Sequence, residues 1–389
     1  MAPQAETFTI GVEEEYQIIH PKTRQLWGRS PHILPIAQSA LDERLVQPEF
    51  RLSQLEVATP ICHSLQEVRL QLLRLRREVV AAAAATGSQI AAAGTHPFSC
   101  WREQLITPKA CYQKLAERYQ RLMHELVTFG CHVHIGLGDR ELAVQVMNRA
   151  RIWLAPLLAL SASSPFWLGA DTGYASYRTV LISRLPMTGP PLIFQSYSDY
   201  QGTVQSLIAT QTIQEATQIC WDLRLSERFP TIEFRVADAC STVDEAVLMA
   251  GLARALVRTC YEEALQDRPY KAVRPELLRA AHWCAARSGL AGDLIDVEVE
   301  RPVPAEKLVG KLLNYLRPAL QAFEEWEEVG AIAQQILQRG TATDRQRMVY
   351  RQTGSLERVV DFLVQETGQG LHPNPESLSL KNIPVHPLG

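Results

Sequence analysis

Apolar and polar residues alternate in four short segments of the chain, 9–18, 52–58, 130–137 and 231–237. Successive side chains of a β-strand point to opposite faces, so each segment predicts a strand with one apolar and one polar face. Such strands are typical of an antiparallel sheet that helices cover on one side and leave open on the other. The pattern therefore predicts an α+β fold in which helices pack on the outer face of an antiparallel sheet.

The polar faces of these strands carry acidic, imidazole and guanidinium groups. In chain order these groups belong to Glu13, Glu15, Glu56, His132, His134, Glu233 and Arg235, with Gln54 beside Glu56. Residues two apart on a strand lie about 6.5–7 Å apart on one face, so Glu13 and Glu15 can each hold one of two adjacent cations. Carboxylate oxygens suit Mg²⁺ or Mn²⁺, and an imidazole can complete the site. Four such strands favour metal binding over a merely solvated surface.

The same alternation places Cys131 on the face that the helices cover. Adjacent strand residues face opposite ways, which argues against a thiol–imidazole nucleophile made of Cys131 and His132. The eight cysteines are scattered without a C-x-x-C pair, so we expect reduced thiols rather than a disulfide framework or a zinc site.

Helical spacing of apolar residues appears over residues 65–79 and 112–126. Ser64 with Glu67 and Thr242 with Glu245 have the spacing of a capping box, in which a hydroxyl and a carboxylate satisfy free amides of the first turn. The second box precedes an apolar helix that extends to about residue 264. Residues 275–366 are predicted to be mostly helical.

The charge balance bears on the class of partner. Lys and Arg total 39 and Asp and Glu total 42, a formal net charge of −3, whereas nucleic-acid binders usually carry a basic domain or stripe. No polybasic surface for anionic lipid and no membrane-crossing apolar stretch are evident. The N-terminus lacks the pattern of a signal peptide. We expect small-molecule partners, no nucleic acid, no membrane and a cytoplasmic location.

No internal repeat or long flexible linker divides the 389 residues. We predict a single catalytic domain over residues 1–370 and a Pro-rich C-terminal tail over residues 371–389. Several common motifs are absent: there is no P-loop, no complete dinucleotide-binding fingerprint, no H-E-x-x-H and no G-x-S-x-G. Nucleotide binding through those motifs is therefore not expected.

Seven segments in this order resemble one family, the glutamate–cysteine ligase type 2 carboxylate–amine ligases. They are residues 11–16 (GVEEEY), 54–60 (QLEVATP), 94–98 (GTHPF), 132–136 (HVHIG), 164–167 (SPFW), 171–178 (DTGYASYR) and 231–238 (TIEFRVAD). The likeness runs from about residue 7 to about residue 366. Ser163 departs from the family pattern, which has Asn there, and the Pro-rich tail exceeds the family's usual end.

The family is similar to glutamine synthetase and guanidino kinases, which implies a curved antiparallel sheet that forms an open active-site cup. The resemblance implies that Glu13, His132 and Glu233 bind one cation at the ATP phosphates, and that Glu15 and Glu56 bind a second. It assigns His134 to phosphate, Arg235 to the transferred phosphoryl group, and Arg178 to ATP phosphates or an amino-acid carboxylate. The implied cofactors are ATP and two or three Mg²⁺ or Mn²⁺ ions.

The implied reaction joins glutamate to cysteine. The γ-carboxylate would attack ATP to give γ-glutamyl phosphate and ADP, and the amine would then displace phosphate to give γ-glutamylcysteine. An ammonium cannot attack, so a base is needed. The sequence leaves this base open, with Glu14 and Asp171 as candidates. The motifs identify the reaction better than the amine, so a ligase for a different small amine, or for another carboxylate, stays open.

Other hypotheses are a non-catalytic ATP–Mg sensor, a phosphotransferase that makes no amide, and a metal-dependent hydrolase. A homodimer is possible. Around the site, His96 is expected to hold a turn, and residues 170–202 to form a long connection suited to a lid. Trp221, Asp222 and Arg224 are expected to line the floor beneath Glu233 or to form a packed corner. Gln346 and Arg347 are candidates for a C-terminal flap.

Overall fold

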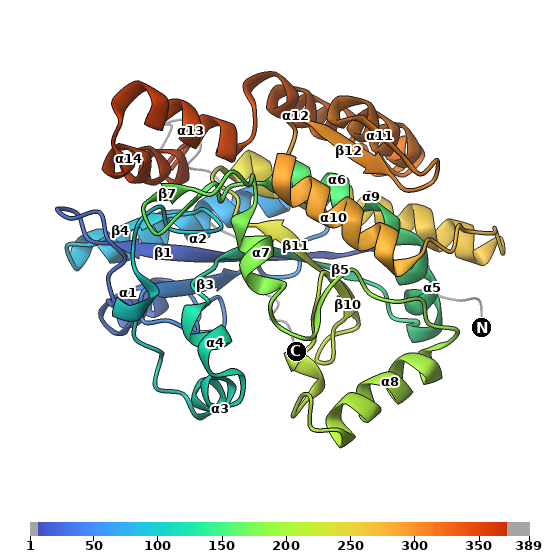
Figure 1. The fold of residues 1–389 in the computed structure, drawn as a ribbon, viewed down its shortest axis with the longest axis horizontal. Coiled ribbons are helices and arrows are strands. Elements are labelled where there is room, and N and C mark those ends of the chain that lie inside the picture. Colours follow the sequence, from blue (N-terminus) through green and yellow to red (C-terminus); the bar gives the residue numbers. More distant parts are fainter. Residues whose placement is uncertain (1–6, 372–389) are drawn as a thin grey trace.

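A seven-stranded antiparallel sheet crosses the centre of the computed structural model, which describes residues 7–371 (Figure 1). Its order is β10-β11-β5-β1-β3-β2, and β4 also pairs with β1. The strands are β1 (Ile10–Ile19), β2 (Val46–Pro48), β3 (Gln54–Ala58), β4 (Gln89–Ala91), β5 (Gly130–Gly136), β10 (Leu223–Leu225) and β11 (Thr231–Asp238). The four strands that the alternation predicted are the adjacent strands β11, β5, β1 and β3, so the predicted fold class is confirmed.

Alternating burial along β1 matches the predicted two-faced strand. From Ile10 to Tyr16, buried residues alternate with half-buried ones, and Glu13 and Glu15 belong to the half-buried set. Glu14 lies on the buried side, where its carboxylate forms an ion pair with Arg76 and accepts a hydrogen bond from the Tyr16 hydroxyl. The apparent exception in the pattern is therefore a buried ion pair beneath the sheet.

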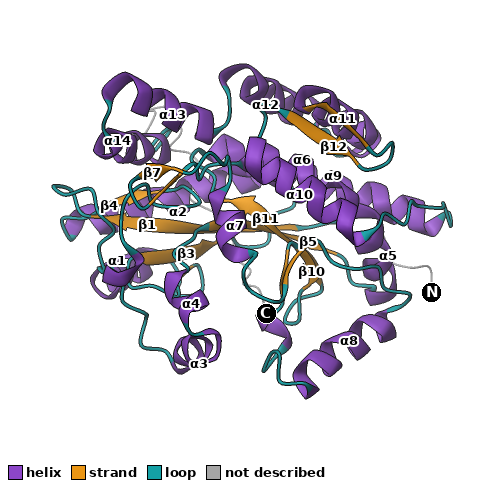
Figure 2. Cartoon of the chain, in the orientation of Figure 1, coloured by secondary structure: helices purple, strands orange, loops and turns teal. Residues whose placement is uncertain are grey.

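Helices lie on both sides of the sheet, as Figure 2 shows. The helices are α1 (Ser30–Ala40), α2 (Leu65–Ala85), α3 (Ala110–Tyr119), α4 (Arg121–Glu125), α5 (Arg140–Ala150), α6 (Leu154–Ser161), α7 (Tyr177–Ile182), α8 (Tyr197–Ala209), α9 (Val243–Leu265), α10 (Pro275–Ser288), α11 (Ala305–Ala322), α12 (Trp326–Arg339), α13 (Ala342–Thr353) and α14 (Leu356–Thr367). Three two-stranded sheets are β6 (Phe166–Trp167) with β7 (Ala170–Asp171), β8 (Thr188–Gly189) with β9 (Cys220–Trp221), and β12 (Asp293–Asp296) with β13 (Arg301–Pro304).

The main core lies between the sheet and helices α2, α5, α6 and α9. Val12 of β1, Val133 of β5 and Phe234 of β11 are buried there with the apolar residues of these helices. Cys131 is fully buried in the same core, as the alternation predicted. Burying one large apolar side chain contributes about 1.5–3 kcal/mol, so this layer holds the strands and thereby fixes the polar side chains on their other face.

The helix ends agree with the sequence in part. Thr242 and Glu245 form the predicted capping box at α9. At α2 the Ser64 hydroxyl accepts from the Glu67 amide, but the Glu67 carboxylate accepts from the His63 amide rather than closing the box. The predicted helix 112–126 is divided into α3 and α4, because Gln120 between them adopts a positive φ of 46°. The segment 170–202 is not structureless, since it contains β7, α7, β8 and the beginning of α8.

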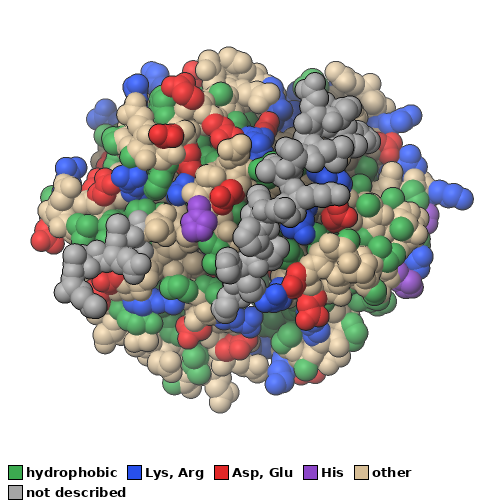
Figure 3. Space-filling model, turned by 180° about the vertical axis from the view of Figure 1, so that it is seen from behind, with side chains coloured by type: hydrophobic (Ala, Val, Ile, Leu, Met, Phe, Trp, Pro, Cys, Tyr) green, Lys and Arg blue, Asp and Glu red, His purple; other side chains and the backbone are tan. Residues whose placement is uncertain are grey.

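In the described part of the chain no helix combines the length and the apolar character that a membrane span requires. On the face of the molecule in Figure 3, outside the grey atoms, basic and acidic side chains are interspersed with apolar ones. The predicted Pro-rich tail falls, from residue 372 on, outside the described residues. The domain boundary near residue 370 therefore stays a prediction.

Candidate active site

The polar face of the sheet brings together the residues that the four strands contribute. Across the strand pairs, Glu13 lies opposite His132, Glu15 opposite Glu56, and His134 opposite Glu233. Directly opposite side chains on one face of an antiparallel pair have Cβ atoms about 4.5–5.5 Å apart. One continuous band of ionisable groups thus crosses β3, β1, β5 and β11.

Three of these residues form a cluster with the geometry of a cation site. Ligand atoms of Glu13, His134 and Glu233 all lie within 4.8 Å of one another. The Nε2 atom of His134 lies 3.3 Å from a Glu13 carboxylate oxygen and 3.9 Å from one of Glu233, yet among the described residues it has no hydrogen-bond partner. A buried nitrogen between two carboxylates, without a partner of its own, is suited to a cation.

The two imidazoles of β5 have different surroundings. The Nδ1 atom of His132 also lies 3.3 Å from Glu13, but a guanidinium nitrogen of Arg235 lies 3.5 Å from the same atom. Burial and the positive charge of Arg235 lower the pKa of His132 to about 4. Among the described residues His134, rather than His132, completes the cluster with Glu13 and Glu233.

Mutual attraction within the cluster shifts its pKa values. Burial would raise the pKa of Glu13, but His134 and His132 outweigh it and hold that pKa well below its usual value. Burial would lower the pKa of His134, but Glu13 and Glu233 raise it. The carboxylates thus remain ionised and available as ligands, because each charge is favoured by its neighbours.

Two arginines hold Glu233. The Nε atom of Arg224 on β10 donates to Glu233 at 2.7 Å. Arg235, which follows Glu233 by two residues on β11, also donates to the Glu233 carboxylate. Burial would raise the pKa of Glu233, yet Arg235, His134 and Arg224 lower it. A carboxylate offers about four lone-pair positions, so these bonds orient Glu233 and still leave room for a cation.

A second group of carboxylates lies beside the first. Glu15 and Glu56 face each other, and Glu49 joins them from the segment between β2 and β3, where Tyr112 donates to it at 3.3 Å. Burial and the charge of Glu49 raise the pKa of Glu15 to about 7. Burial, Glu13, Glu49 and Glu15 raise the pKa of Glu56 well above its usual value. The negative charges of neighbouring carboxylates repel one another unless a proton or a cation binds.

Arg178 of α7 reaches the same face from above β5. A Cβ atom on Gly130 would lie 2.5 Å from a guanidinium nitrogen of Arg178, so the glycine makes room for this side chain. Arg178 donates to the Arg235 carbonyl at 3.3 Å and lies 3.9 Å from Asp238, while its buried Nε has no partner within residues 7–371. The side chain is therefore held in place but still has a donor to offer.

Cavities follow the polar band. The largest cavity on this face of the sheet, of about 470 Å³, is lined by Glu15, His132, Arg178 and Arg235 and, on its other side, by apolar residues of α3, α4 and α7. Neighbouring cavities of about 270, 190 and 220 Å³ are lined in turn by Glu56, His134 and Glu233, and each also includes Glu13. All the predicted site residues thus line neighbouring cavities on the open face of the sheet.

The remaining predictions lie at the edge of this space or away from it. His96 is fully buried, contacts the Arg24 carbonyl and accepts from two amides of its own turn, as predicted. Ser163 is also buried and binds backbone groups and Asp238, a structural role. Trp221 is buried and packs against Phe194, which fits the predicted packed corner. Arg224 donates to Glu233, which fits the predicted position beneath that residue.

Gln346 and Arg347 do not form the predicted C-terminal flap. Gln346 is buried and donates to the Ser163 carbonyl at 2.7 Å. Arg347 forms two hydrogen bonds to Asp171, at 2.7 and 2.9 Å. These two side chains attach α13 to the body of the molecule. Arg347 also occupies both oxygens of Asp171, one of the two candidate bases.

Sequence reasoning missed three residues that line the cavities, Glu49, Arg228 and His282. Glu49 lies outside any alternating segment, and Arg228 belongs to the short turn between β10 and β11. His282 is a single histidine on an otherwise ordinary helix, α10. None of these has a motif, and only the packing of distant segments brings them to the site.

Solved structures identify the class of fold. The glutamate–cysteine ligase of Francisella tularensis, in a complex with AMP, matches with a TM-score of 0.71 at 12% identity, covering 96% of this chain and 91% of that one. A bifunctional glutathione synthetase from Pasteurella multocida matches with a TM-score of 0.64 at 16% identity, covering 93% and 52%. The chain therefore shares its fold with these two ligases.

Relatives of similar sequence identify the family within this fold. A protein of Rhodopirellula baltica with the provisional name glutamate–cysteine ligase 2 is 42% identical over 363 residues, 92% of this chain and 96% of that protein. A protein of Herpetosiphon aurantiacus with the same provisional name is 39% identical over 364 residues, 94% of each chain. The model of glutamate–cysteine ligase family 2 matches residues 9–361. The chain belongs to this family of ATP-dependent ligases, as its motifs indicated.

Proposed function

We propose that this enzyme joins the γ-carboxylate of glutamate to the amine of cysteine, forming γ-glutamylcysteine with release of ADP and phosphate. The observation that carries the proposal is the excess of carboxylates on the open face of the sheet. Glu13, Glu15, Glu49 and Glu56 lie there, next to the guanidinium groups of Arg178 and Arg235. Burial raises the pKa values of Glu15, Glu49 and Glu56, whereas His134 and His132 lower that of Glu13. That combination suits Mg–ATP and an anionic substrate.

The residues present fit divalent cations. Glu13, His134 and Glu233 would hold one, and Glu15 and Glu56, with Glu49 beside them, a second. His134 thus takes the ligand role expected of His132. Cations held there supply neutralisation of the charge on the phosphate oxygens. Oxygen-rich sites with one imidazole suit Mg²⁺ or Mn²⁺.

Arg235 would act in phosphoryl transfer. In this step an oxygen of the glutamate γ-carboxylate bonds to the γ-phosphorus of ATP while the bond to the ADP oxygen breaks. The transition state spreads charge over the phosphoryl oxygens, so positioned donors matter most. Burial would lower the pKa of Arg235, but Glu233 raises it and keeps the guanidinium charged. Glu233 also fixes its direction through their ion pair.

Arg178 would bind an anionic group of a substrate, either a phosphate of ATP or the α-carboxylate of an amino acid. Its buried Nε has no partner among the described residues, and it lines the largest cavity with Arg235. A guanidinium binds a carboxylate or phosphate through two parallel hydrogen bonds. Placing the substrate anion there would bring the carboxylate that reacts toward Arg235.

A second candidate acceptor is a bulkier, less polar amine. Phe50, Tyr112, Leu115, Tyr119 and Met123 form an apolar wall on one side of the 470 Å³ cavity. Such a wall can bury more apolar surface than the side chain of cysteine offers. The fold and the proposed metal sites would serve either amine equally.

The test is release of ADP and phosphate from Mg–ATP and glutamate, with and without cysteine, with the dipeptide detected by mass. We expect release that depends on cysteine and a γ-glutamyl dipeptide. Release of ADP and phosphate with an aromatic or aliphatic amine, but not with cysteine, would mean that the acceptor is that amine and that the proposed mechanism still holds. ATP binding without turnover for any amine would favour the sensor, and ADP without phosphate or amide would favour a phosphotransferase.

A further inference from the structure

The amine-attack step needs a proton acceptor, and the two residues that the sequence offered do not reach the substrate space. Glu14 is buried under the sheet with Arg76 and Tyr16. Asp171 is held by Arg347 and does not line the largest cavity. A base that belongs to the protein is therefore another residue.

Asp222 and His282 meet at the wall of the largest cavity, among the groups that line it with Arg178 and Arg235. Asp222 lies between β9 and β10, next to Arg235, whose amide donates to the Asp222 carbonyl at 2.8 Å. His282 comes from α10. An Asp222 carboxylate oxygen lies 3.3 Å from the His282 Nε2.

Each of these two side chains has a buried polar atom without a hydrogen bond. In the part of the chain that the structure describes, Oδ2 of Asp222 faces His282 Nε2 at 3.3 Å outside hydrogen-bond geometry, and Nδ1 of His282 has no hydrogen-bond partner. Only 13% of the Asp222 side chain and 10% of the His282 side chain are exposed. Leaving a buried polar group unpaired costs about 1–3 kcal/mol, so such a pair at a cavity wall points to a ligand that completes it.

A second aspartate nearby makes the contrast clear. Asp238 is fully buried close to Arg178, but its carboxylate accepts from the Ser163 amide and from the hydroxyls of Ser164 and Ser176, at 2.7–2.9 Å. Asp238 is thus a satisfied structural group. Asp222 has the same chemistry in the same region, but within residues 7–371 its carboxylate pairs only with His282, and the residue lines the cavity.

We propose that Asp222 accepts the proton of the substrate ammonium and that His282 positions the Asp222 carboxylate. This inference rests on the proposed function. The ammonium gives one proton to Asp222, and the freed nitrogen lone pair forms a bond to the acyl carbon of the γ-glutamyl phosphate. The carbon–oxygen bond to phosphate then breaks, and the second proton of the new amide nitrogen leaves with the phosphate.

The charges around Asp222 fit this role. Burial raises its pKa, while His282 from α10, Arg178 from α7 and Arg235 from β11 lower it in part. A carboxylate that is less acidic than usual is a better proton acceptor near neutral pH. The adjacent arginines can meanwhile bind the anionic groups of the acyl phosphate, which places ammonium and anion side by side.

The test uses two acceptors, cysteine and hydroxylamine, with the full-length chain, Mg–ATP and glutamate. Hydroxylamine is largely unprotonated at neutral pH and needs no base. We expect Asp222→Asn to lower the rate of dipeptide formation about 10²–10⁴-fold, and to leave hydroxamate formation within about threefold of the wild type. The matched control is Asp171→Asn, which should change neither rate appreciably.

The outcomes separate the inference from the proposed function. Equal loss with both acceptors, in a folded Asp222→Asn protein, would assign Asp222 to phosphoryl transfer and overturn the inference, as would no loss with either. A wild-type protein that makes no product with any amine would overturn the proposed function, and the inference with it.

If Asp222→Asn does not fold, His282→Asn gives the answer. His282 lowers the pKa of Asp222, so its removal should move the acidic limb of the rate–pH profile to higher pH with cysteine. With hydroxylamine the profile should not move. An unchanged profile with cysteine, or the same displacement with both acceptors, contradicts the proposal.

Discussion

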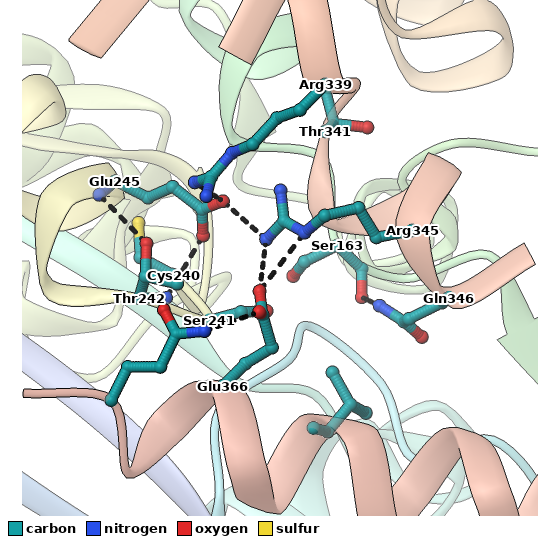
Figure 4. A network of polar contacts seen from close by, with 12 residues as sticks. Ser163, Cys240, Ser241, Thr242, Glu245, Arg339, Thr341, Arg345, Gln346 and Glu366 are labelled. Carbon is teal, nitrogen blue, oxygen red and sulfur yellow. Dashed lines mark hydrogen bonds and ion pairs between the residues drawn. The ribbon is translucent and has the colours of Figure 1, made fainter. Parts of the chain in front are cut away.

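Two regions of this molecule bury ionised side chains. In one region the protein balances the buried charges itself, and in the other an excess of negative charge remains. Behind the sheet, Arg345 of α13 donates to Glu245 of α9 and to Glu366 of α14, each at 2.7 Å, and Arg339 lies 3.4 Å from Glu245 (Figure 4). Two guanidinium groups meet two carboxylates there. On the open face, the carboxylates of Glu13, Glu15, Glu49, Glu56 and Glu233 outnumber the guanidinium groups of Arg178, Arg224, Arg228 and Arg235.

The difference lies in what completes each group. In the network behind the sheet the protein satisfies its own charges, and the network joins α9 to the C-terminal helices α12, α13 and α14. On the open face negative charge is left over, and burial together with the neighbouring carboxylates raises the pKa values of Glu15 and Glu56. A closed set of charges is structural, whereas an incomplete one that lines cavities is suited to cations and substrate.

Arg345→Met should be the largest change, since it leaves Glu245 and Glu366 buried without their common partner. Removing one side of a buried ion pair costs about 3–5 kcal/mol. Denaturant unfolding measures this loss, and the activity per folded molecule should be preserved. Arg351→Met, on the exposed side of the same helix, is the control and should stay within about 0.5 kcal/mol of the wild type. Equal effects of the two substitutions would mean that the network contributes nothing special.

Glu13→Gln should have the opposite effect, a large loss of activity with little loss of stability, because it removes charge from the cation site and no core volume. We expect a loss of ADP formation of about 10²–10³-fold, comparable to removal of one transition-state contact, with little change in the free energy of unfolding. Single-turnover kinetics and denaturation on the same sample measure both quantities. A variant with near-normal turnover would contradict the assignment of Glu13 to a metal site.

His134→Asn and His132→Asn compare the two imidazoles of the open face. The geometry predicts that His134→Asn weakens Mn²⁺ binding by about tenfold or more, since ligand or near-ligand changes typically cost about 10–100-fold in affinity. His132→Asn should weaken it less, because His132 faces Arg235. Paramagnetic titration with Mn²⁺ alone measures both. The opposite order would restore the assignment that the family resemblance implied.

Affinity for Mg²⁺ should depend on pH through Glu15. Its pKa of about 7 in the free protein means that below pH 7 a proton must leave before the cation binds, so affinity falls by up to about tenfold per pH unit per proton released. The raised pKa also means that the folded protein without metal binds more protons than the unfolded chain, so its stability falls as pH rises from about 4.5 to 7. Calorimetry in two buffers measures proton release, and Glu15→Gln should reduce it.

Cys131→Ala should be the smallest change. The thiol is buried in the core on the helix side of β5, so we expect a loss of about 1 kcal/mol in stability and turnover within about twofold of the wild type. Thermal unfolding and steady-state rates measure these effects. Loss of chemistry in a folded variant would require β5 to present its other face to the cavities.

The open face was largely predictable from the sequence, and the network behind the sheet hardly at all. Period-two alternation specifies which side chains share a face. That rule alone places Glu13, Glu15, Glu56, His134, Glu233 and Arg235 in one group. The capping box at Thr242 is equally readable, but no pattern indicates that the carboxylate of Glu245 meets Arg345 and Glu366 from the C-terminal helices (Figure 4).

Strand faces, helix starts and the motifs that mark the ligase family follow from the residues themselves, because alternation and capping act between positions only a few apart. Tertiary packing was needed to establish which histidine approaches Glu233, how Glu49 joins the carboxylates, and that Asp222 meets His282 at a cavity wall. Contacts between such distant segments depend on how complete layers of helices and strands pack, and no short pattern encodes them.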